Sequence, residues 1–339
     1  MMKLFVLKSV VFSILCILIG VLLGYISNTV SPSSVFKREY FLREYLLSHA
    51  NEIEALNVGS SHAIAVDLKE LGYQGCDLWQ MGMDLFEIKH QLETYVPKLP
   101  NLKTVFFCVW YASFNRDNGA FKLKGRAPRR QLYYAVIPSW KPVDGRIGDL
   151  LKGKLLPIAR RYHWKGVFTC ILHRQINRHP APSILPSMLN SPAMRKIKSS
   201  ALLAKHAEQI RFPYHMKLQK GMEKNHPNLT KDTYNAVAQT IKYLLEKNIR
   251  VIFYTPAPYR AYSEIFKKKN NRTLVKMKQI MKKLVTQYHI EYYDLSGVGR
   301  ISRNNKLYYD SDHLNRKGTL VFTKSFKRIL INKSARKVD

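Results

Sequence analysis

The stretch Asn57-Val58-Gly59-Ser60-Ser61-His62 joins an apolar run, 53–58, to a helix-like run, 63–71. An apolar run that ends in small residues before a helix predicts a tight turn at the carboxyl edge of a sheet. Such a turn holds a serine hydroxyl clear of the backbone, where nucleophiles stand in open α/β folds. For this stretch alone two interpretations stay open. Either Ser61 is a nucleophile, or the turn is structural, with Gly59 for its backbone angles and a serine that caps the helix.

Near the other end of the chain the sequence reads Tyr309-Asp310-Ser311-Asp312-His313-Leu314-Asn315, followed by Gly318. An Asp three residues before a His, on a loop that enters a helix, lets the carboxylate orient the imidazole that deprotonates a serine. Asp312 is the alternative orienting acid. Asn315 is predicted to cap the last helix, where Gly318 allows close packing.

Taken together, Gly59-Ser60-Ser61 and Asp310-x-x-His313 resemble the SGNH (GDSL-like) hydrolase superfamily, over about residues 51–114 and 231–331. The Gly-Ser-Ser variant with this late block looks most like the envelope members of that superfamily. Those include the lipoteichoic-acid D-alanylation proteins and the O-acyltransferases or esterases of surface polysaccharides. The resemblance implies a flavodoxin-like α/β sandwich and a catalytic Ser61, activated by His313 and oriented through Asp310.

The resemblance also implies hydrogen-bond donors for an oxyanion. The Ser61 N–H is one donor, and Gly82 is the other, unless Gly82 is an ordinary turn glycine. The family's third block carries an Asn as a further donor, which this sequence lacks. Tyr111, Ser113 and Asn115, at or just after the end of the third predicted strand, are candidate substitutes; without one, the departure from the family pattern weakens the prediction of full hydrolytic activity.

For His62, next to the serine, two interpretations are open: contact with the substrate, or the favoured one, a surface residue in the first helical turn. His226 and the other histidines between the two core segments show no ligand spacing. We therefore expect no metal site and no cofactor.

Strand-like and helix-like runs alternate along the core segments. The predicted strands are 53–58, 74–79, 104–111, 250–255 and 290–294. The predicted helices are 62–71, 83–97, 231–247, 260–288 and 316–331. Near-continuous apolar strands that alternate with helices predict a parallel sheet covered on both faces, and we expect flavodoxin-like strand order.

The predicted domain organisation has five parts: an N-terminal membrane anchor (1–27), a linker with a short helix over 36–49 (28–50), the first part of the SGNH-like core (51–114), an inserted cap (115–230) and the second part of the core (231–339). The insertion is far longer than an ordinary loop, with helix-like parts at 146–160 and 193–211. It either caps the sheet edge and shapes a substrate groove, or lies on a membrane. Some of its basic and aromatic residues are predicted to face an anionic polymer: Arg129, Arg130, Tyr133, Tyr134, Arg160, Arg161, Tyr162, Trp164 and Lys165.

Residues 9–26 carry no charge and follow Lys3 and Lys8. This pattern predicts a single-pass helix that acts as an uncleaved signal anchor. The basic residues between 37 and 43 oppose the orientation that Lys3 and Lys8 favour. Because long domains translocate largely regardless of charge, we place the catalytic domain on the extracytoplasmic side of the cytoplasmic membrane.

Lysine and arginine number 56 against 23 acidic residues, which gives a net charge of +33. This excess of positive charge indicates which partners the protein can bind and says nothing about its fold. The candidate partners are nucleic acid, anionic lipid and an acidic glycan or teichoic-type polymer. The sequence has no zinc spacing and no ribonucleoprotein aromatic pattern, so no specific nucleic acid is expected. A solvated basic surface is the simpler alternative.

The four cysteines are predicted to be buried free thiols: Cys16, Cys76, Cys108 and Cys170.

Two functions from different classes follow. The first is a membrane-anchored, serine-dependent acyl esterase or O-acyltransferase that acts on a cell-envelope glycan or teichoic-type polymer, with a membrane-bound O-acyltransferase as a candidate partner. The second is a catalytically weak accessory or binding protein on the same scaffold, which binds an anionic envelope polymer.

Overall fold

The computed structural model describes residues 2–30, 42, 45–119, 129–143, 146–155 and 199–335. The chain divides into two compact units, Met1–Arg43 with Phe121–Ala181, and Glu44–Ala120 with Pro182–Asp339. Both motif blocks belong to the second unit, so this unit carries the candidate site.

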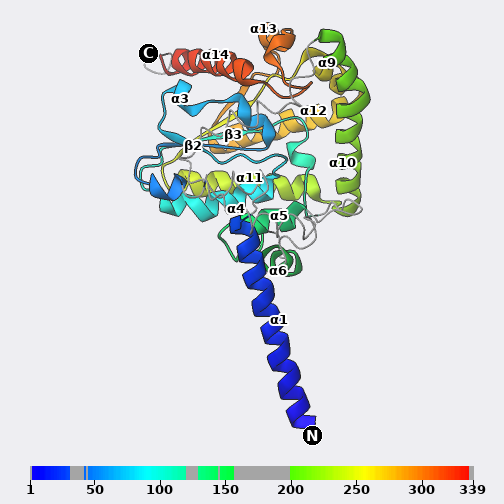
Figure 1. Cartoon of the computed structure of the whole chain (residues 1–339). Helices are drawn as coiled ribbons and strands as arrows, with labels where there is room; N and C mark the ends of the chain where they lie inside the picture. The colour runs from blue at the N-terminus through cyan, green and yellow to red at the C-terminus, as the bar shows by residue number, and fades with distance from the viewer. Residues whose placement is uncertain are drawn as a thin grey trace. The chain divides into compact units, whose positions relative to one another are not determined.

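The second unit is built on a five-stranded sheet in which every pairing is parallel (Figure 1). Its strands are β1 (Ala55–Val58), β2 (Gly75–Asp77), β3 (Thr104–Cys108), β4 (Arg250–Thr255) and β5 (Glu291–Asp294). The order β2-β1-β3-β4-β5 is that of flavodoxin-like sheets, in which ligands bind at the carboxyl ends of β1 and β3. The predicted α/β class, parallel pairing and strand order are confirmed.

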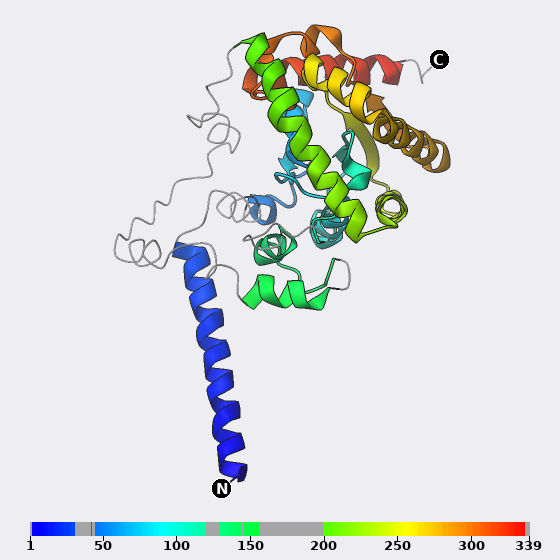
Figure 2. The ribbon, with the colours of Figure 1, turned by 90° about the vertical axis from the view of Figure 1, so that its right-hand side faces the viewer.

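Helices cover both faces of this sheet (Figure 1). One face carries η1 (Ser61–Ala65), α3 (Leu68–Leu71) and α14 (Arg316–Ala335), and the other carries α4 (Leu85–Tyr95) and α11 (Leu229–Glu246). The other elements of this unit are η2 (Val96–Lys98), η3 (Ser113–Asn115), α9 (Ser200–His206), the π-helical turn η5 (Ala207–Arg211), α10 (Phe212–Asn225), α12 (Arg260–Tyr288), α13 (Gly299–Ser302) and η6 (Asn305–Leu307). Figure 2 shows α9, η5 and α10 as one continuous helical rod.

The central strand β3 is buried along its whole length. Its successive side chains alternate between the two faces. Phe106 packs edge-on against Phe326 of α14, whereas Phe107 stacks on Phe253 of β4 at 4.6 Å between ring centroids. Because both faces are covered, the strand needs apolar residues at every position, which is the uninterrupted apolar pattern that the sequence shows.

The predicted single helix over 62–71 is wrong. The chain forms η1 and then α3, and Val66 between them is extended, with φ −109° and ψ 130°. The Asp67 carboxylate accepts the backbone N–H groups of Lys69 and Glu70, so it starts a new helix instead of continuing the first. The third strand also ends earlier than predicted, at Cys108.

The predicted helices over 83–97, 231–247, 260–288 and 316–331 are present as α4, α11, α12 and α14. Asn315 caps α14 as predicted, because its Oδ1 accepts the Gly318 N–H at 3.0 Å. A Cβ on Gly318 would lie 2.0 Å from the Leu307 carbonyl oxygen, so the predicted close packing is also confirmed.

The predicted insertion contributes helices to both units. In the first unit, α5 (Arg129–Val136) packs against α6 (Ile147–Leu155), and in the second unit the rod begins at Ser200. Arg130, Tyr133 and Tyr134 of α5 are buried and offer no exposed face to a polymer, which corrects the prediction for these three residues. The basic and aromatic residues predicted at 160–165 lie outside the described residues.

The N-terminal helix α1 (Met2–Val30) is 29 residues long, and its Phe5, Phe12 and Leu18 side chains are exposed. Within the described part of the chain, no helix combines the length and the apolar character that crossing a membrane requires. Most of the short helix predicted at 36–49 falls outside the described residues.

The cysteine prediction is confirmed at two positions, since Cys76 and Cys108 are free and buried. Cys16 is free but exposed, so the prediction of a buried thiol is wrong there. Cys170 lies outside the described residues.

Candidate active site

The serine corner follows β1 directly. Gly59 has a φ of 149°, and a Cβ at this position would lie only 2.7 Å from the Cys108 Cβ at the end of β3. Both the angle and the close approach require glycine. The chain then turns into η1, where Ser61 is partly exposed, while Ser60 and His62 on either side are buried.

The turn after Ser61 is fixed by a buried amide that sequence reasoning missed. Asn57 Nδ2 donates to the Ala63 carbonyl oxygen at 2.9 Å, and Asn57 Oδ1 accepts the Tyr254 hydroxyl at 2.8 Å. From α14, the Thr319 hydroxyl donates to the Ile64 carbonyl oxygen at 2.9 Å. These bonds hold η1 between β4 and α14 and so set the position of Ser61.

The late motif block lies on a loop that reaches back to the end of β4. Tyr308 and Leu314 form an isolated antiparallel bridge that closes the loop. The Tyr308 hydroxyl donates to the Ala257 carbonyl oxygen at 2.8 Å, and the Tyr259 N–H donates to the Ser311 carbonyl oxygen at 3.1 Å. The loop is thereby fixed at the carboxyl edge of the sheet.

The structure brings Ser61, His313 and Asp310 together. Ser61 Oγ lies 2.8 Å from His313 Nε2, and His313 Nδ1 lies 2.9 Å and 3.0 Å from the two Asp310 oxygens. Asp310 also accepts the backbone N–H groups of Asp312 and His313, which fixes its carboxylate. Asp312 lies farther from His313 Nδ1, at 3.4 Å, so Asp310 is the better-placed orienting acid.

A second set of Ser, His and Asp lies beside the first. Ser60 Oγ lies 3.1 Å from His62 Nδ1, and His62 Nε2 lies 3.1 Å from Asp312 Oδ2. The His62 ring stacks between Trp110, at 4.2 Å, and His313, at 4.6 Å between centroids. The prediction of a surface residue is therefore wrong: His62 is 5% exposed, because its partners come from distant parts of the chain and enclose it.

Arg211, at the end of η5, joins the two sets. Its Nε donates to Asp312 Oδ1 at 2.7 Å, and its Nη2 lies 3.3 Å from His313 Nδ1 and 3.5 Å from His313 Nε2. Asp310 and Ser61 already occupy these two ring nitrogens. Arg211 Nη2 therefore lies close to the His313 ring without forming a hydrogen bond to it. Sequence reasoning missed Arg211, which stands about a hundred positions before the motif in a segment with no recognisable pattern.

The two histidines have opposite pKa shifts. Burial lowers the pKa of His62 to about 4, although the hydrogen bond to Asp312 opposes this. Burial also acts to lower the pKa of His313, but Asp310 and Asp312 outweigh it and raise that pKa to about 9. Burial acts to raise the pKa of Asp312, but His313 and Arg211 hold it well below its usual range. At neutral pH, His62 is therefore neutral, His313 is cationic and Asp312 is anionic.

The predicted oxyanion donors are the backbone N–H groups of Ser61 and Gly82. An oxyanion donor must lie near the nucleophile, and its N–H must not be used by another acceptor. Gln80 N–H donates to the Gly59 carbonyl oxygen at 3.2 Å, which brings the turn with Gly82 beside the serine corner. Gly82 has a φ of 68°, and Asn118 Nδ2 holds its carbonyl oxygen at 2.9 Å. In the described part of the chain, neither the Ser61 N–H nor the Gly82 N–H donates to another backbone oxygen outside the helices and strands.

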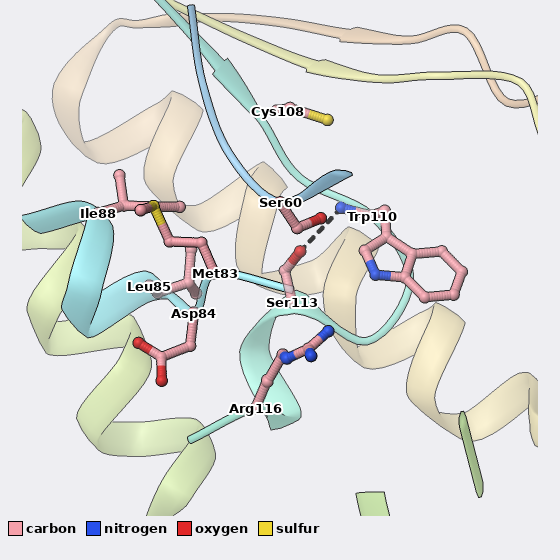
Figure 3. Close-up of a pocket in the computed structure, with 9 residues that line it drawn as sticks. All are labelled: Ser60, Met83, Asp84, Leu85, Ile88, Cys108, Trp110, Ser113 and Arg116. Carbon is pink, nitrogen blue, oxygen red and sulfur yellow. Dashed lines mark hydrogen bonds between the residues drawn. The ribbon is translucent and has the colours of Figure 1, made fainter. Parts of the chain in front are cut away.

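Of the three predicted substitutes for the third donor, two are engaged elsewhere. The Tyr111 hydroxyl lies 3.0 Å from Ser263 Oγ, and Asn115 Nδ2 donates to Glu223 at 2.8 Å. Ser113 Oγ accepts the Trp110 N–H at 2.9 Å and lines a cavity of about 10 Å³ together with Ser60 (Figure 3). This cavity has room for about one water molecule, and Ser113 is the substitute that lines it together with Ser60 of the serine corner.

His62, Asp312 and His313 offer ligand atoms within 4.8 Å of one another, among the residues that the structure describes. The Arg211 guanidinium occupies one Asp312 oxygen, and its positive charge would repel a cation bound there. Both ring nitrogens of His313 also have partners. This set of side chains therefore does not fit a metal ion.

Fold and site together define an α/β protein with a Ser–His–Asp arrangement at the carboxyl edge of its parallel sheet. No family model and no curated protein matches the sequence. The resemblance to the SGNH superfamily therefore stays a prediction that rests on Gly59-Ser60-Ser61 and Asp310-x-x-His313.

Proposed function

We propose that this protein is a serine-dependent acyl-ester enzyme of the SGNH type, acting on an O-acylated glycan or teichoic-type polymer of the cell envelope. The observation that carries this proposal is the 2.8 Å approach of Ser61 Oγ to His313 Nε2, with Asp310 on the other ring nitrogen. The three side chains come from two ends of the chain, yet they have the geometry that nucleophilic catalysis requires.

The first half of the reaction transfers the acyl group to the protein. Neutral His313 accepts the Ser61 proton at Nε2 while Ser61 Oγ bonds to the ester carbonyl carbon. The Ser61 and Gly82 N–H groups stabilise the negative charge on the carbonyl oxygen. His313 then gives its proton to the alcohol oxygen, the bond between carbon and alcohol oxygen breaks, and an acyl-Ser61 ester remains.

The second half returns Ser61 to its free form. An acceptor hydroxyl gives its proton to His313 and attacks the acyl carbon, and the bond to Ser61 Oγ breaks as His313 reprotonates that oxygen. With water as acceptor the protein is an esterase, and with a polymer hydroxyl it is an O-acyltransferase.

A fluorophosphonate probe tests this proposal directly. We expect covalent labelling of Ser61, located by peptide mass spectrometry, and no labelling of the Ser61→Ala variant. Labelling should proceed faster at pH 9 than at pH 7, because His313 must lose a proton before it can act as a base. An unlabelled Ser61 at both pH values in the folded protein would contradict the proposal.

Two observations favour the second candidate, a catalytically weak accessory or binding protein for an anionic envelope polymer. Tyr111 and Asn115 are engaged away from the site, which leaves a weaker set of oxyanion donors than the family pattern implies. His313 is also protonated at neutral pH, where a protonated imidazole does not act as a base. This candidate predicts polymer binding without labelling of Ser61.

We further propose that the protein is attached to the cytoplasmic membrane through α1. Residues 9–26 carry no charge, and the Phe5, Phe12 and Leu18 side chains of α1 are exposed. Deletion of residues 2–30 should release the protein into the soluble fraction. Retention of the shortened protein on membranes washed with high salt would contradict attachment through α1.

A further inference from the structure

The Arg211 guanidinium is fixed along one edge and open along the other. Its Nε is bonded to Asp312, whose side chain is fully buried, whereas the Arg211 side chain is 23% exposed. Nη1 has no hydrogen-bond partner among the described residues, and it is not fully buried. The Nη1 protons therefore face solvent and are free to bind a ligand.

A proline explains the local helix geometry around this side chain. The Phe212 N–H donates to the Ala207 carbonyl oxygen five positions back, which is the π-helical pattern of η5. The next residue, Pro213, has no N–H and its ring crowds the preceding turn, so the helix widens there. Such turns are frequent at functional sites. On the same turn, Glu208 pairs with Lys269 of α12 at 3.8 Å.

Arg211 lies on the alcohol side of the proposed reaction. Its Nη2 is 3.5 Å from His313 Nε2, the nitrogen that returns a proton to the leaving alcohol. The alcohol oxygen of a bound ester must come within about 3 Å of that nitrogen, so the atoms attached to this oxygen come close to the guanidinium. The ester carbonyl oxygen is directed instead to the Ser61 and Gly82 N–H groups.

We infer that Arg211 binds an anionic group carried by the alcohol half of the ester, a few bonds from the ester oxygen. The inference rests on the proposed function, because it takes Ser61 as the nucleophile. The open guanidinium edge matches the oxygen pairs of a phosphate diester or a carboxylate. The substrate class is therefore an O-acyl ester of a polyol phosphate or of a uronate.

Arg211 also holds Asp312, so a loss of activity in a variant would not by itself identify a binding role. A preference between two substrates separates the roles, since damage to the catalytic groups lowers both rates and leaves their ratio unchanged. Each anionic test ester is therefore paired with a neutral ester of the same skeleton. The pairs are the acetyl esters of glycerol methyl phosphate and of glycerol, and of methyl glucuronide and of methyl glucoside.

The wild-type protein should prefer the anionic member of one pair by about 10- to 100-fold in kcat/KM, as expected for a charged hydrogen bond. The pair that shows the preference distinguishes the phosphate from the carboxylate. Arg211→Gln should bring that ratio close to one, and Arg211→Lys should keep only part of it. Lys269→Gln is the matched control: it removes one charge next to η5 and should leave the ratio unchanged. An unchanged ratio in Arg211→Gln would overturn the inference.

Equilibrium binding separates the anion site from the chemistry. Calorimetry on the Ser61→Ala protein with glycerol methyl phosphate or methyl glucuronide should show binding that Arg211→Gln weakens about tenfold or more. If Ser61 is never acylated but this binding depends on Arg211, the enzyme proposal fails and the anion site stands. Absence of binding, or binding that Arg211→Gln does not change, overturns the inference whatever the catalytic result.

Discussion

Two Ser–His–Asp sets lie next to each other in this protein, and only one is arranged for catalysis. In Ser61–His313–Asp310 the serine is partly exposed, and Nε2 of the histidine faces it. In the Ser60–His62–Asp312 set all three residues are buried and Nδ1 faces the serine.

The difference between the two histidines lies in their surroundings. His313 faces two carboxylates, which raise its pKa to about 9. His62 is enclosed between two rings, and its carboxylate partner is shared with Arg211, so its pKa falls to about 4. Histidine therefore has different roles in the two sets. His313 gains a proton readily, whereas His62 stays neutral and stacks on the His313 ring.

The largest expected effect distinguishes the two serines. Ser61→Ala should lower acyl transfer by about 10⁴-fold or more, because it removes the nucleophile. Ser60→Ala should change the rate by less than about tenfold, since among the described residues the Ser60 hydroxyl bonds to the buried His62 and not to the reacting groups. Ester turnover and labelling by the fluorophosphonate measure both variants. Equal losses in the two variants would mean that the sets do not differ in role.

The two carboxylates come next. Asp310→Asn should lower kcat by about 10⁴-fold, because an amide favours the wrong histidine tautomer. Asp312→Asn should instead lower the free energy of unfolding by about 3 to 5 kcal/mol, since Arg211 and His62 lose a buried charged partner. Denaturant unfolding and steady-state kinetics on both variants give the comparison. A stability loss confined to Asp310→Asn would reverse the assignment.

The sequence predicted those parts of the molecule that local patterns determine. Apolar runs with turn residues between them located β1, β3 and β4, because a strand buried on both faces needs apolar residues throughout. The edge strands β2 and β5 are only partly buried and carry polar residues, and the alternation with helices located them. The spacing of Asp310 and His313 located one half of the site, since a single loop carries both residues. The close approach of this loop to Ser61 follows from parallel strands that end at one edge.

The remaining parts depend on contacts between distant residues. The break between η1 and α3 combines the local cap at Asp67 with distant bonds, because Asn57 and Thr319 of α14 bond the carbonyl oxygens of Ala63 and Ile64. The burial of His62 depends on Asp312 and on Trp110, which lie far away in the sequence. The pattern of residues within a short stretch of sequence does not show which distant residues will contact it.

The raised pKa of His313 predicts an alkaline limb in the pH profile. Because only the neutral imidazole accepts the Ser61 proton, kcat/KM should rise about tenfold per pH unit from pH 7 and level off near pH 9. Asp312→Asn removes a negative charge beside the ring, so its limb should move to lower pH. The profile is measured with an ester whose spontaneous hydrolysis is subtracted at each pH. A profile that is flat between pH 7 and pH 9 would contradict the assignment.

The smallest expected effect concerns His62 and appears in stability. A histidine with a pKa of about 4 when folded and about 6.5 when unfolded binds more protons in the unfolded state, so stability falls as the pH drops from about 6.5 towards 4. The loss from this one group between pH 7 and pH 5 is roughly 2 kcal/mol. His62→Gln does not titrate, so the stability difference between wild type and variant should shrink by this amount over that range. Urea unfolding at the two pH values measures the difference, which cancels contributions from the other histidines. A difference that stays constant would mean that His62 is not the buried neutral ring of the second set.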